Sequence, residues 1–452
     1  MTTRTRPDRT QLVWIAAVAA LGLVVTWQMA LSWPHNYDEG FNYLFFGDRG
    51  FRFTIDNYTY PNNHILFSLL QAAIPRSLVD AEPLVLRAPN IFISAGLLVV
   101  LTAEVRRRWS SLPMAVALVL AGPWSIIFFP VARGYQLGAL LVAVALLVAS
   151  RYPDEAWTPP AAAVLMALAA WTVPTFAFGA PVVTALWAAR RKGQAAVVYS
   201  ALFVVLAFLL YLPVLDQLFG ASAAGRNPTF GLTRFARDVT GELFFLPDWA
   251  ALVIVGVALW ALFEAGRRIV AGTDDGQTRW AAALLGYPVV FLVIAELLPR
   301  FSDVTTPFFR NAAFASLFIP AGIWASASWS RPIVRILLVG LVAWNSILGL
   351  NLYLGVIDGS RIVDYEGTFI GQTPRLDDVL AGEDLAEIRC AWTDEWTCRL
   401  YEKHFEDRGV LVTPLVDTIE ATECGVGRYP PRPDTGIDLI YTDGNIRLVC
   451  FD

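Results

Sequence analysis

The sequence predicts a polytopic α-helical membrane protein that carries a small α/β domain behind its last span. Of the 452 residues, 56% are hydrophobic and only 16% are charged. Apolar runs long enough to cross a bilayer recur over residues 1–357, between short arginine-bearing loops. From about residue 358, charged and turn residues return and the apolar runs shrink to strand length. We therefore expect a membrane domain over 1–357 and a second domain over 358–452.

The first apolar run sets the orientation of the chain. Residues 1–10 carry three arginines, a flank typical of the cytoplasmic side of a membrane. The run over 11–33 is too long for a cleavable signal, and no small-residue cleavage site follows it. We therefore expect a retained first span, a cytoplasmic N-terminus and a first outer loop over 34–84.

The apolar stretch after His64 is too short for an ordinary span. It ends at Pro75, and charged residues follow at once, which favours a helix lying in the membrane interface. The alternative is that 64–82 crosses the membrane, which would invert every later loop. The interfacial reading is favoured because it alone keeps the basic loops on the cytoplasmic side, at 106–108, 190–192, 267–268 and 331–335.

With an interfacial helix at 64–82, the remaining apolar runs predict about eleven crossings of a cell membrane. A proline at 174 divides two short runs, so we expect a kink or break over 171–174. The outer loop over 214–248 and the turn over 299–307 carry or adjoin arginines that run against the positive-inside bias. The expected spans are 11–33, 87–104, 112–130, 134–150, 160–173, 176–189, 195–213, 249–266, 280–298, 308–328 and 332–353.

The domain over 358–452 is expected on the outer, extracytoplasmic side. Its last residues, 434–452, predict a hairpin with an Asp-Gly-Asn turn, and 395–407 predicts a helix. All the cysteines lie here and none in the membrane part, which fits an oxidising compartment and up to two disulfides in any of three pairings. A zinc site is disfavoured because there is no CxxC and His404 is the only nearby imidazole. The cysteines are Cys390, Cys398, Cys424 and Cys450.

The first outer loop opens with two adjacent acids, Asp38 and Glu39. A carboxylate in partly apolar surroundings near a membrane has a raised pKa and can act as a general base. The alternative is that both acids face solvent beyond the first span. Their neighbourhood decides between the two.

The same loop closes with amides, phenols and an imidazole, which form a donor-rich surface suited to a sugar. The N-terminus of a helix there also favours an anion. Alternatively, an asparagine only caps the helix, and a metal-binding role for the histidine has weak support. The candidate substrate-binding residues are Tyr60, Asn62, Asn63 and His64.

Arginines arrive at the outer ends of several expected spans. Arg133 and Tyr135 lie in a turn between two spans, where a planar guanidinium could clamp a phosphate. The alternative is a snorkelling arginine in contact with lipid headgroups. The same choice applies to Arg87, Arg300 and Arg310, although ionisable groups at such depth are costly without a role.

The order of these features resembles the GT-C membrane glycosyltransferases, in particular the branch of protein O-mannosyltransferases and lipid A aminoarabinose transferases. The resemblance covers about residues 11–353. It departs at Asn311, where tyrosine is usual after Arg310, and at the PNNHIL sequence, where a proline-rich version is commoner; the latter indicates a different substrate. The motifs are Asp38-Glu39, the interfacial helix, Leu86-Arg87-Ala88-Pro89 and Ala132-Arg133-Gly134-Tyr135.

The resemblance implies an inverting transfer from a polyprenyl-phosphate-linked sugar to a lipid, glycan or protein acceptor on the outer face. Asp38 would be the base, beside Glu39, and Arg133 with Arg300 or Arg310 would stabilise the leaving phosphate. A divalent cation is possible but not implied, and no other cofactor is expected. The partners are then the donor, the acceptor and the bilayer, and the net charge of −5 argues against nucleic acid.

Two other functions fit parts of the pattern. A transporter or flippase of lipid-linked sugars would need arginines and aromatics but no base. A polymer ligase or assembly factor would depend on the domain over 358–452. Replacing Asp38 by asparagine should stop an enzyme but have little effect on a flippase. Loss of all function on deletion of 358–452, with the Asp38 variant still active, would favour a ligase or assembly factor.

Overall fold

The structure is a computed structural model. It describes residues 9–32, 37–58, 63–102, 111–120, 130–218, 248–301, 314–326, 332–357, 387–390, 411–414, 424–427, 437–443 and 446–451.

The first part of the helical body contains one long helix, a series of short helices and a second long helix. These are α1 (Arg9–Ser32), α2 (Tyr37–Phe41), the π-helix η1 (Asn42–Gly47), α3 (Gly50–Asp56), α4 (Ile65–Ala72), α5 (Arg76–Ala81), the 3-10 helix η2 (Pro83–Arg87) and α6 (Ala88–Thr102).

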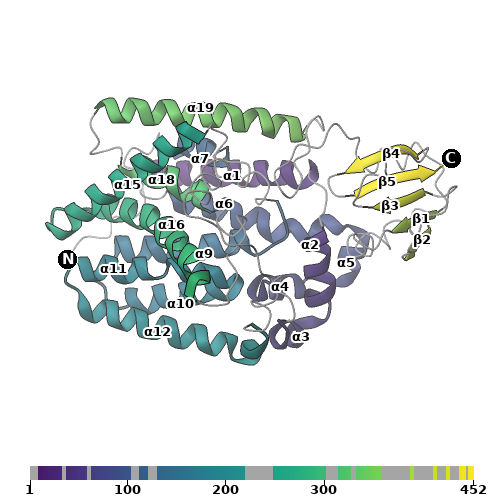
Figure 1. The fold of residues 1–452 in the computed structure, drawn as a ribbon, viewed down its shortest axis with the longest axis horizontal. Coiled ribbons are helices and arrows are strands. Elements are labelled where there is room, and N and C mark those ends of the chain that lie inside the picture. The colour runs from purple at the N-terminus through teal and green to yellow at the C-terminus, as the bar shows by residue number, and fades with distance from the viewer. Residues whose placement is uncertain are drawn as a thin grey trace.

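Most of the helices that follow lie alongside one another (Figure 1). They are α7 (Ser111–Val119), α9 (Tyr135–Arg151), α10 (Thr158–Thr172), the 3-10 helix η4 (Pro174–Gly179), α11 (Pro181–Ala189), α12 (Gly193–Tyr211), the 3-10 helix η5 (Leu212–Val214), α15 (Asp248–Val270), α16 (Gly276–Phe301), α18 (Ala315–Ser326) and α19 (Pro332–Ile357).

The core lies where α9, α10 and α16 meet their neighbours. α10 packs between α9 and α12, α1 packs on α6, and α16 packs on α18. The facing sides of α9 and α10 are rich in buried alanines, and small side chains let two helices approach closely without a void. Large rings from α16 and α18 fill the centre, among them Tyr287 and Phe318.

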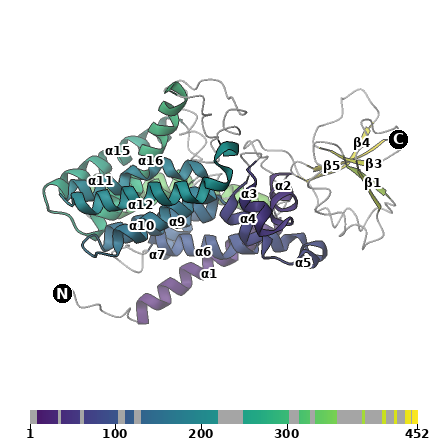
Figure 2. The same ribbon diagram turned by 90° about the horizontal axis from the view of Figure 1, so that it is seen from below.

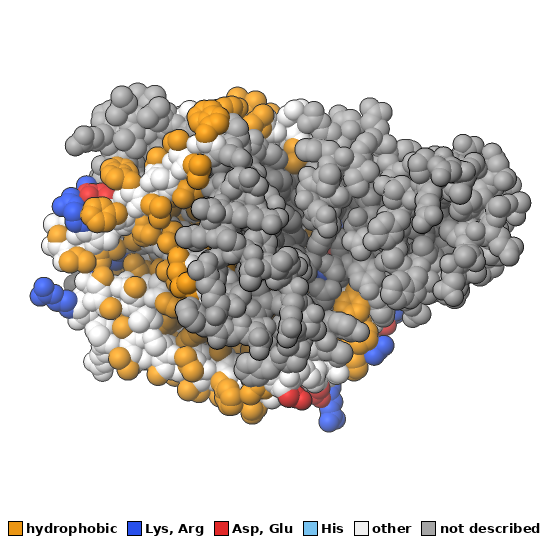
Figure 3. Space-filling view, in the orientation of Figure 1, with side chains coloured by type: hydrophobic (Ala, Val, Ile, Leu, Met, Phe, Trp, Pro, Cys, Tyr) orange, Lys and Arg blue, Asp and Glu red, His pale blue; other side chains and the backbone are white. Residues whose placement is uncertain are grey.

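The described helices are those of an α-helical membrane protein. Four of them are long and apolar enough to cross a bilayer by length and composition. In the most apolar stretch of Gly193–Leu218 only 17% of the residues are buried, and a soluble protein rarely exposes so continuous an apolar face. Figure 3 shows the same pattern: hydrophobic side chains cover the described surface between two charged ends. The four are Arg9–Leu31, Pro83–Thr102, Gly193–Leu218 and Gly276–Ala295.

The segment over 64–82 does not cross a bilayer as one helix. α4 has eight residues and α5 has six, and eight residues make a helix of roughly 12 Å, far short of the hydrocarbon core. Pro75 separates them with an extended backbone (φ −58°, ψ 132°). The expected break over 171–174 is also present, because α10 ends at Thr172 and η4 begins at Pro174. The total of eleven crossings stays a prediction.

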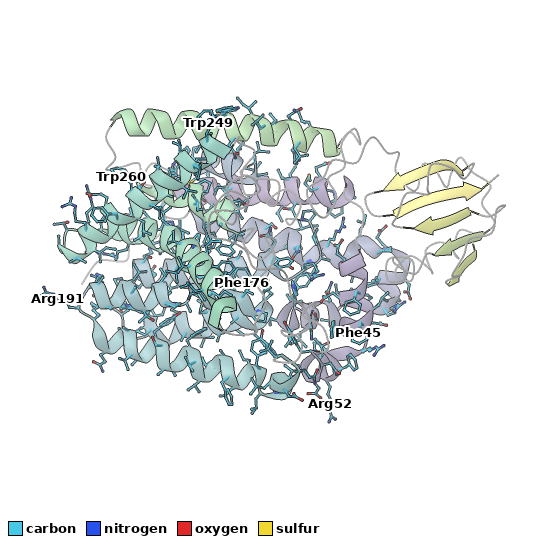
Figure 4. The ribbon with its side chains drawn as sticks, viewed as in Figure 1. Phe45, Arg52, Phe176, Arg191, Trp249 and Trp260 are labelled. Atoms are coloured by element: carbon cyan, nitrogen blue, oxygen red, sulfur yellow. The ribbon has the colours of Figure 1, made fainter. Side chains whose placement is uncertain are left out.

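The helical body has two polar ends. Arg191 marks one end, at the turn between α11 and α12, and Arg52 on α3 marks the other (Figure 4). Seen from below, α1 runs from the first end towards α2, and α3, α4 and α5 gather at the second (Figure 2).

Strands occur only beyond residue 357 in the described part of the chain. They are β1 (Glu387–Cys390), β2 (Leu411–Pro414), β3 (Cys424–Gly427), β4 (Ile437–Asp443) and β5 (Ile446–Phe451), in the order β2-β1-β3-β5-β4. The predicted hairpin corresponds to the antiparallel pair β4–β5, with Asp443 opposite Ile446. The predicted helix over 395–407 lies outside the described residues, so the α/β domain as a whole stays a prediction.

The register of β3 and β5 bears on the cysteines. Cys424 is directly opposite Cys450, and Cα atoms at opposite places in an antiparallel pair are close enough for a disulfide. Of the three pairings, the one that joins these two therefore needs no rearrangement of the sheet. Cys398 lies outside the described residues.

Candidate functional site

A buried turn without helical hydrogen bonds is the centre of the candidate site. It covers residues 130–134, directly before α9, and all five residues are buried. Backbone N–H and C=O groups inside an apolar body must find partners, since each one left unpaired costs several kcal/mol. Here side chains from three other segments supply those partners.

Glu39 on α2 binds this turn from one side. Its Oε1 atom accepts from the backbone N–H of Ala132 at 2.5 Å. Both carboxylate oxygens also accept from Arg87, at 2.9 Å from Nε and 2.7 Å from Nη2, and both side chains are fully buried. Arg87 in turn donates to the carbonyl of Ala30 at the end of α1. The second acid of the pair is therefore part of an ion pair that joins α1, α2, the end of η2 and the turn.

The carbonyl groups of the turn are bound by amides. Asn90 on α6 donates through Nδ2 to the carbonyl oxygen of Val131 and, at 3.2 Å, to that of Arg133. Gln71 on α4 donates to the carbonyl of Ala132 at 3.4 Å. Sequence reasoning did not identify Asn90 or Gln71. The only sequence signal for these residues was a single amide inside an otherwise apolar helix. Many amides in such a position have no functional role, so the signal is weak.

His64, just before α4, binds the end of the turn. The backbone N–H of Gly134 donates to its Nδ1 atom at 2.7 Å. A Cβ added to Gly134 would lie 2.8 Å from that nitrogen and 2.6 Å from Cγ2 of Thr172. Only glycine therefore lets the imidazole and the end of α10 approach this closely.

The other nitrogen of His64 faces Arg133. Its Nε2 atom is 3.2 Å from Nη2 of Arg133. Because Nδ1 accepts from Gly134, the proton of the neutral ring belongs on Nε2, and a guanidinium only donates. Two N–H donors therefore lie next to each other, and an oxygen that accepted from both would relieve their mutual repulsion. Tyr135 borders it: its ring is edge-on to His64 and 5.7 Å from the guanidinium carbon of Arg133.

Tyr58 is buried close to Tyr135 and Arg133. Burial raises the pKa of its phenol, and the nearby charge of Arg133 opposes that rise. Its ring meets Tyr211 edge to face, and its backbone N–H donates to Gln217 at 2.6 Å. Gln217 also donates to the carbonyl of Asp56 at 3.1 Å. The loop that leads to His64 is thus fixed to the helix that ends near Gln217.

Asn63 binds backbone and a hydroxyl within the loop. It donates to the carbonyls of Thr54 and Asn57 and accepts from Ser68. The residue at the N-cap of α4 is His64, and no side chain caps that helix. Asn63 is therefore neither a helix cap nor directed at a free surface, since its side chain is buried.

The structure brings several of the predicted residues together and leaves others undescribed. Residues in or beside the turn are Glu39, His64, Arg87, Arg133 and Tyr135. Asp38 lies in α2, next to Glu39, with its side chain outside the described part, and Arg300 lies in the last turn of α16 with its side chain likewise not described. Tyr60, Asn62 and Arg310 lie outside the described residues.

Arg87 differs from its expected role in one respect. Its guanidinium binds Glu39 and Ala30 inside the protein, and it is fully buried. These contacts favour a role in holding the site together rather than direct contact with a substrate. Within the described part of the chain, no group of three or more histidine, cysteine or acidic residues could hold a metal ion.

Comparison of the chain with protein-family models, with curated proteins and with solved structures returns no significant match. Function is therefore inferred from the residues of the site and from the order of the motifs.

Proposed function

We propose that this protein is a membrane glycosyltransferase that moves a sugar from a polyprenyl-phosphate donor to a lipid, glycan or protein acceptor, with inversion at the anomeric carbon. The observation that carries the proposal is the facing pair of donors from His64 and Arg133, held on a buried turn that Glu39 also binds. This arrangement offers two donors to an oxyanion. It lies close to the acid pair, because Glu39 bonds Ala132, the residue just before Arg133.

The leaving group fits the pair of donors. As the bond between the anomeric carbon and the phosphate oxygen breaks, its electron pair goes to that oxygen. Preorganised donors stabilise such developing charge without reorganising, and a guanidinium beside an imidazole N–H offers two of them. A polyprenyl phosphate carries less charge than a nucleotide diphosphate, so the guanidinium of Arg133 supplies part of the counter-charge and the imidazole N–H of His64 adds a hydrogen bond.

The base belongs on the other side of the sugar. Glu39 contacts the residue next to Arg133, which supports the proposal because the backbone of Asp38 is then close to the same turn. In the proposed step Asp38 takes the proton of the acceptor hydroxyl while that oxygen forms its bond to the anomeric carbon. The proton then leaves the carboxyl for solvent or for the released phosphate.

The proposed topology places the N-terminus in the cytoplasm and the site, with the domain over 358–452, on the outer face of about eleven crossings. Its support is the separation of two polar ends: the basic turn at Arg191 lies at one, and α2 to α5 lie at the other (Figures 1 and 4). The lipid tail of the donor explains why the site is built inside a membrane protein.

The test compares Asp38→Asn with Asp56→Asn in nanodiscs. Asp56 lies in the same loop, but its half-exposed carboxylate pairs only weakly with exposed Arg52, so it is a matched control. The substrates are a panel of polyprenyl-phosphate-linked hexoses and pentoses, with a cell-envelope extract as the source of acceptor. We expect Asp38→Asn to lose donor consumption by at least about a hundredfold while keeping donor binding in native mass spectrometry.

Each other outcome has a defined meaning. If both variants consume the donor like the unchanged protein, Asp38 is not the base. If no sugar of the panel is consumed but labelled donor crosses the bilayer of proteoliposomes, the protein is a flippase. Loss of all function on deletion of 358–452, with Asp38→Asn still active, favours an assembly factor.

A further inference from the structure

We infer that Asn90 is a positioning residue, which holds the buried turn so that Arg133 faces His64. Its effect on turnover rests on the proposed function, but its hold on the turn does not. The inference starts from its Nδ2 atom, which donates to two carbonyl groups, those of Val131 and Arg133. One amide therefore fixes the backbone on both sides of Ala132.

α6 provides a rigid base for this contact. Asn90 lies in the first turn of α6, three residues after Arg87, which is the last residue of η2, so the two side chains reach the turn from neighbouring positions in the chain. Arg87 reaches the N–H of Ala132 through Glu39, while Asn90 reaches the carbonyls on either side. α6 itself packs against α1 and α9. The turn is thus held by two independent connections, one through Glu39 from Arg87 and one directly from Asn90.

The other half of the amide shows that Asn90 does more than fill space. The Oδ1 atom of Asn90 is buried and has no hydrogen-bond donor in the part of the chain that the structure describes. The end of the amide that faces the turn is assigned as Nδ2, because two carbonyl oxygens lie around it. Burying an acceptor without a donor costs free energy, so an apolar side chain would serve better if Asn90 only filled space. The hydrogen bonds of the donor end to the turn offset that cost.

The consequence concerns the direction of Arg133. Its carbonyl is bound by Asn90, and the next N–H, that of Gly134, is bound by His64. The peptide unit between Arg133 and Gly134 therefore has a fixed orientation before any ligand arrives. When a catalytic group is misplaced by about 1 Å, the rate of the reaction can fall by up to a hundredfold. The amide of Asn90, held on a rigid helix, is well placed to prevent such a shift of Arg133.

The experiment uses Asn90→Asp in the full-length protein. The substitution keeps the size and shape of the side chain but replaces the donor with an oxygen that repels the two carbonyls. Hydrogen exchange of the peptide that contains 130–136 should become at least about threefold faster than in the unchanged protein. Thr102→Val is the control, because the hydroxyl of Thr102 lies on the same helix and binds only its own backbone carbonyls at Leu98 and Val99.

Turnover supplies the second measurement. Asn90→Asp should lower kcat for donor consumption by about tenfold to a hundredfold, with KM nearly unchanged. Combined with Arg133→Ala it should add no further loss, because Asn90 acts through Arg133. Asn90→Leu separates these effects from the cost of burying a charge, because it removes the donor without adding a carboxylate. A volume-only role predicts that Asn90→Leu exchanges and turns over like the unchanged protein, whereas loss of the hold on the turn predicts faster exchange over 130–136 in Asn90→Leu as well.

The inference is wrong if exchange over 130–136 is unaltered in Asn90→Asp, or if the losses from Asn90→Asp and Arg133→Ala simply multiply. Failure of the proposed function looks different. No donor of the panel would then be consumed by the unchanged protein, while faster exchange in Asn90→Asp would still show that Asn90 holds the turn.

Discussion

One ion pair from each polar end of the helical body shows how burial changes the effect of a charge. At the end with α2, the pair of Glu39 and Arg87 is fully buried and binds backbone groups of two other segments. At the end with Arg191, Asp154 pairs with Arg190 and Lys192, and its side chain is 65% exposed. The first pair is built into the site, whereas the second holds loop ends in contact with solvent.

The difference in burial decides how much each pair matters. Removing one partner of a buried pair leaves an uncompensated charge in a medium of low dielectric constant. An exposed pair loses only a screened attraction, which water largely replaces. The loops at the Arg191 end also have other connections, since Asp274 binds Arg279 at 2.5 Å. We therefore expect stability and function to depend on the first end far more than on the second.

Glu39→Gln should have the largest effect. The amide keeps the shape of the side chain but leaves the buried guanidinium of Arg87 without its counter-charge, at a cost of about 3–5 kcal/mol. Unfolding of the detergent-purified protein by denaturant titration measures this free energy. Adding Arg87→Met to the variant should recover part of the loss, because the remaining charge is then removed. An effect below about 1 kcal/mol would show that the pair is solvated.

Gly134→Ala should have an intermediate effect, of about 1–3 kcal/mol from overpacking. The new methyl group would displace His64 and Thr172, the two side chains that it meets closer than 3 Å. We expect donor consumption to fall along with the melting temperature, since His64 must move. Gly256→Ala on α15 is the control, because nothing lies within 4 Å of the added Cβ there. If the two variants melt alike, the close approach of His64 to the turn is not real.

Asp154→Asn should have the smallest effect, below about 1 kcal/mol at neutral pH. The hydrogen bond from Lys192 lowers the pKa of the Asp154 carboxyl. A lowered pKa in the folded state contributes stability above the ordinary value of 3.8, and the contribution disappears as the pH falls below it. The stabilities of Asp154→Asn and the unchanged protein should therefore converge as the pH falls below about 4, through the lowered folded-state pKa. A difference that no longer changes with pH at the acid end of the titration would require another role for Asp154.

Much of the helical framework follows from hydropathy alone. The runs over 134–150, 195–213 and 280–298 are apolar because they face lipid or a core, and each contains a helix in the structure. The short stretch after His64 shows that length carries information too, since α4 is too short to cross. The proline at 174 marks the end of α10 because it cannot continue the helical ladder.

The site was predictable only as a set of candidates. Charge and rarity in an apolar sequence point to Glu39, His64 and Arg133, but they do not say which atoms meet. The contact between His64 and Gly134 spans 70 residues, and no local pattern encodes such a pairing. The sequence does not single out Asn90, because one amide in a long apolar run is common in helices. Its role depends on a contact with a turn 41 residues away.

Gln217 joins a long apolar helical segment to the loop that precedes the candidate site. It belongs to the segment Gly193–Leu218, which is long and apolar enough to cross a bilayer, and its amide bonds both Asp56 and Tyr58, a few residues before His64. A helix changes its tilt when the hydrocarbon thickness changes. Such a tilt must either break two hydrogen bonds or move Asp56 and Tyr58 along with the helix. We therefore expect the strength of this contact to vary with the thickness of the bilayer around the protein.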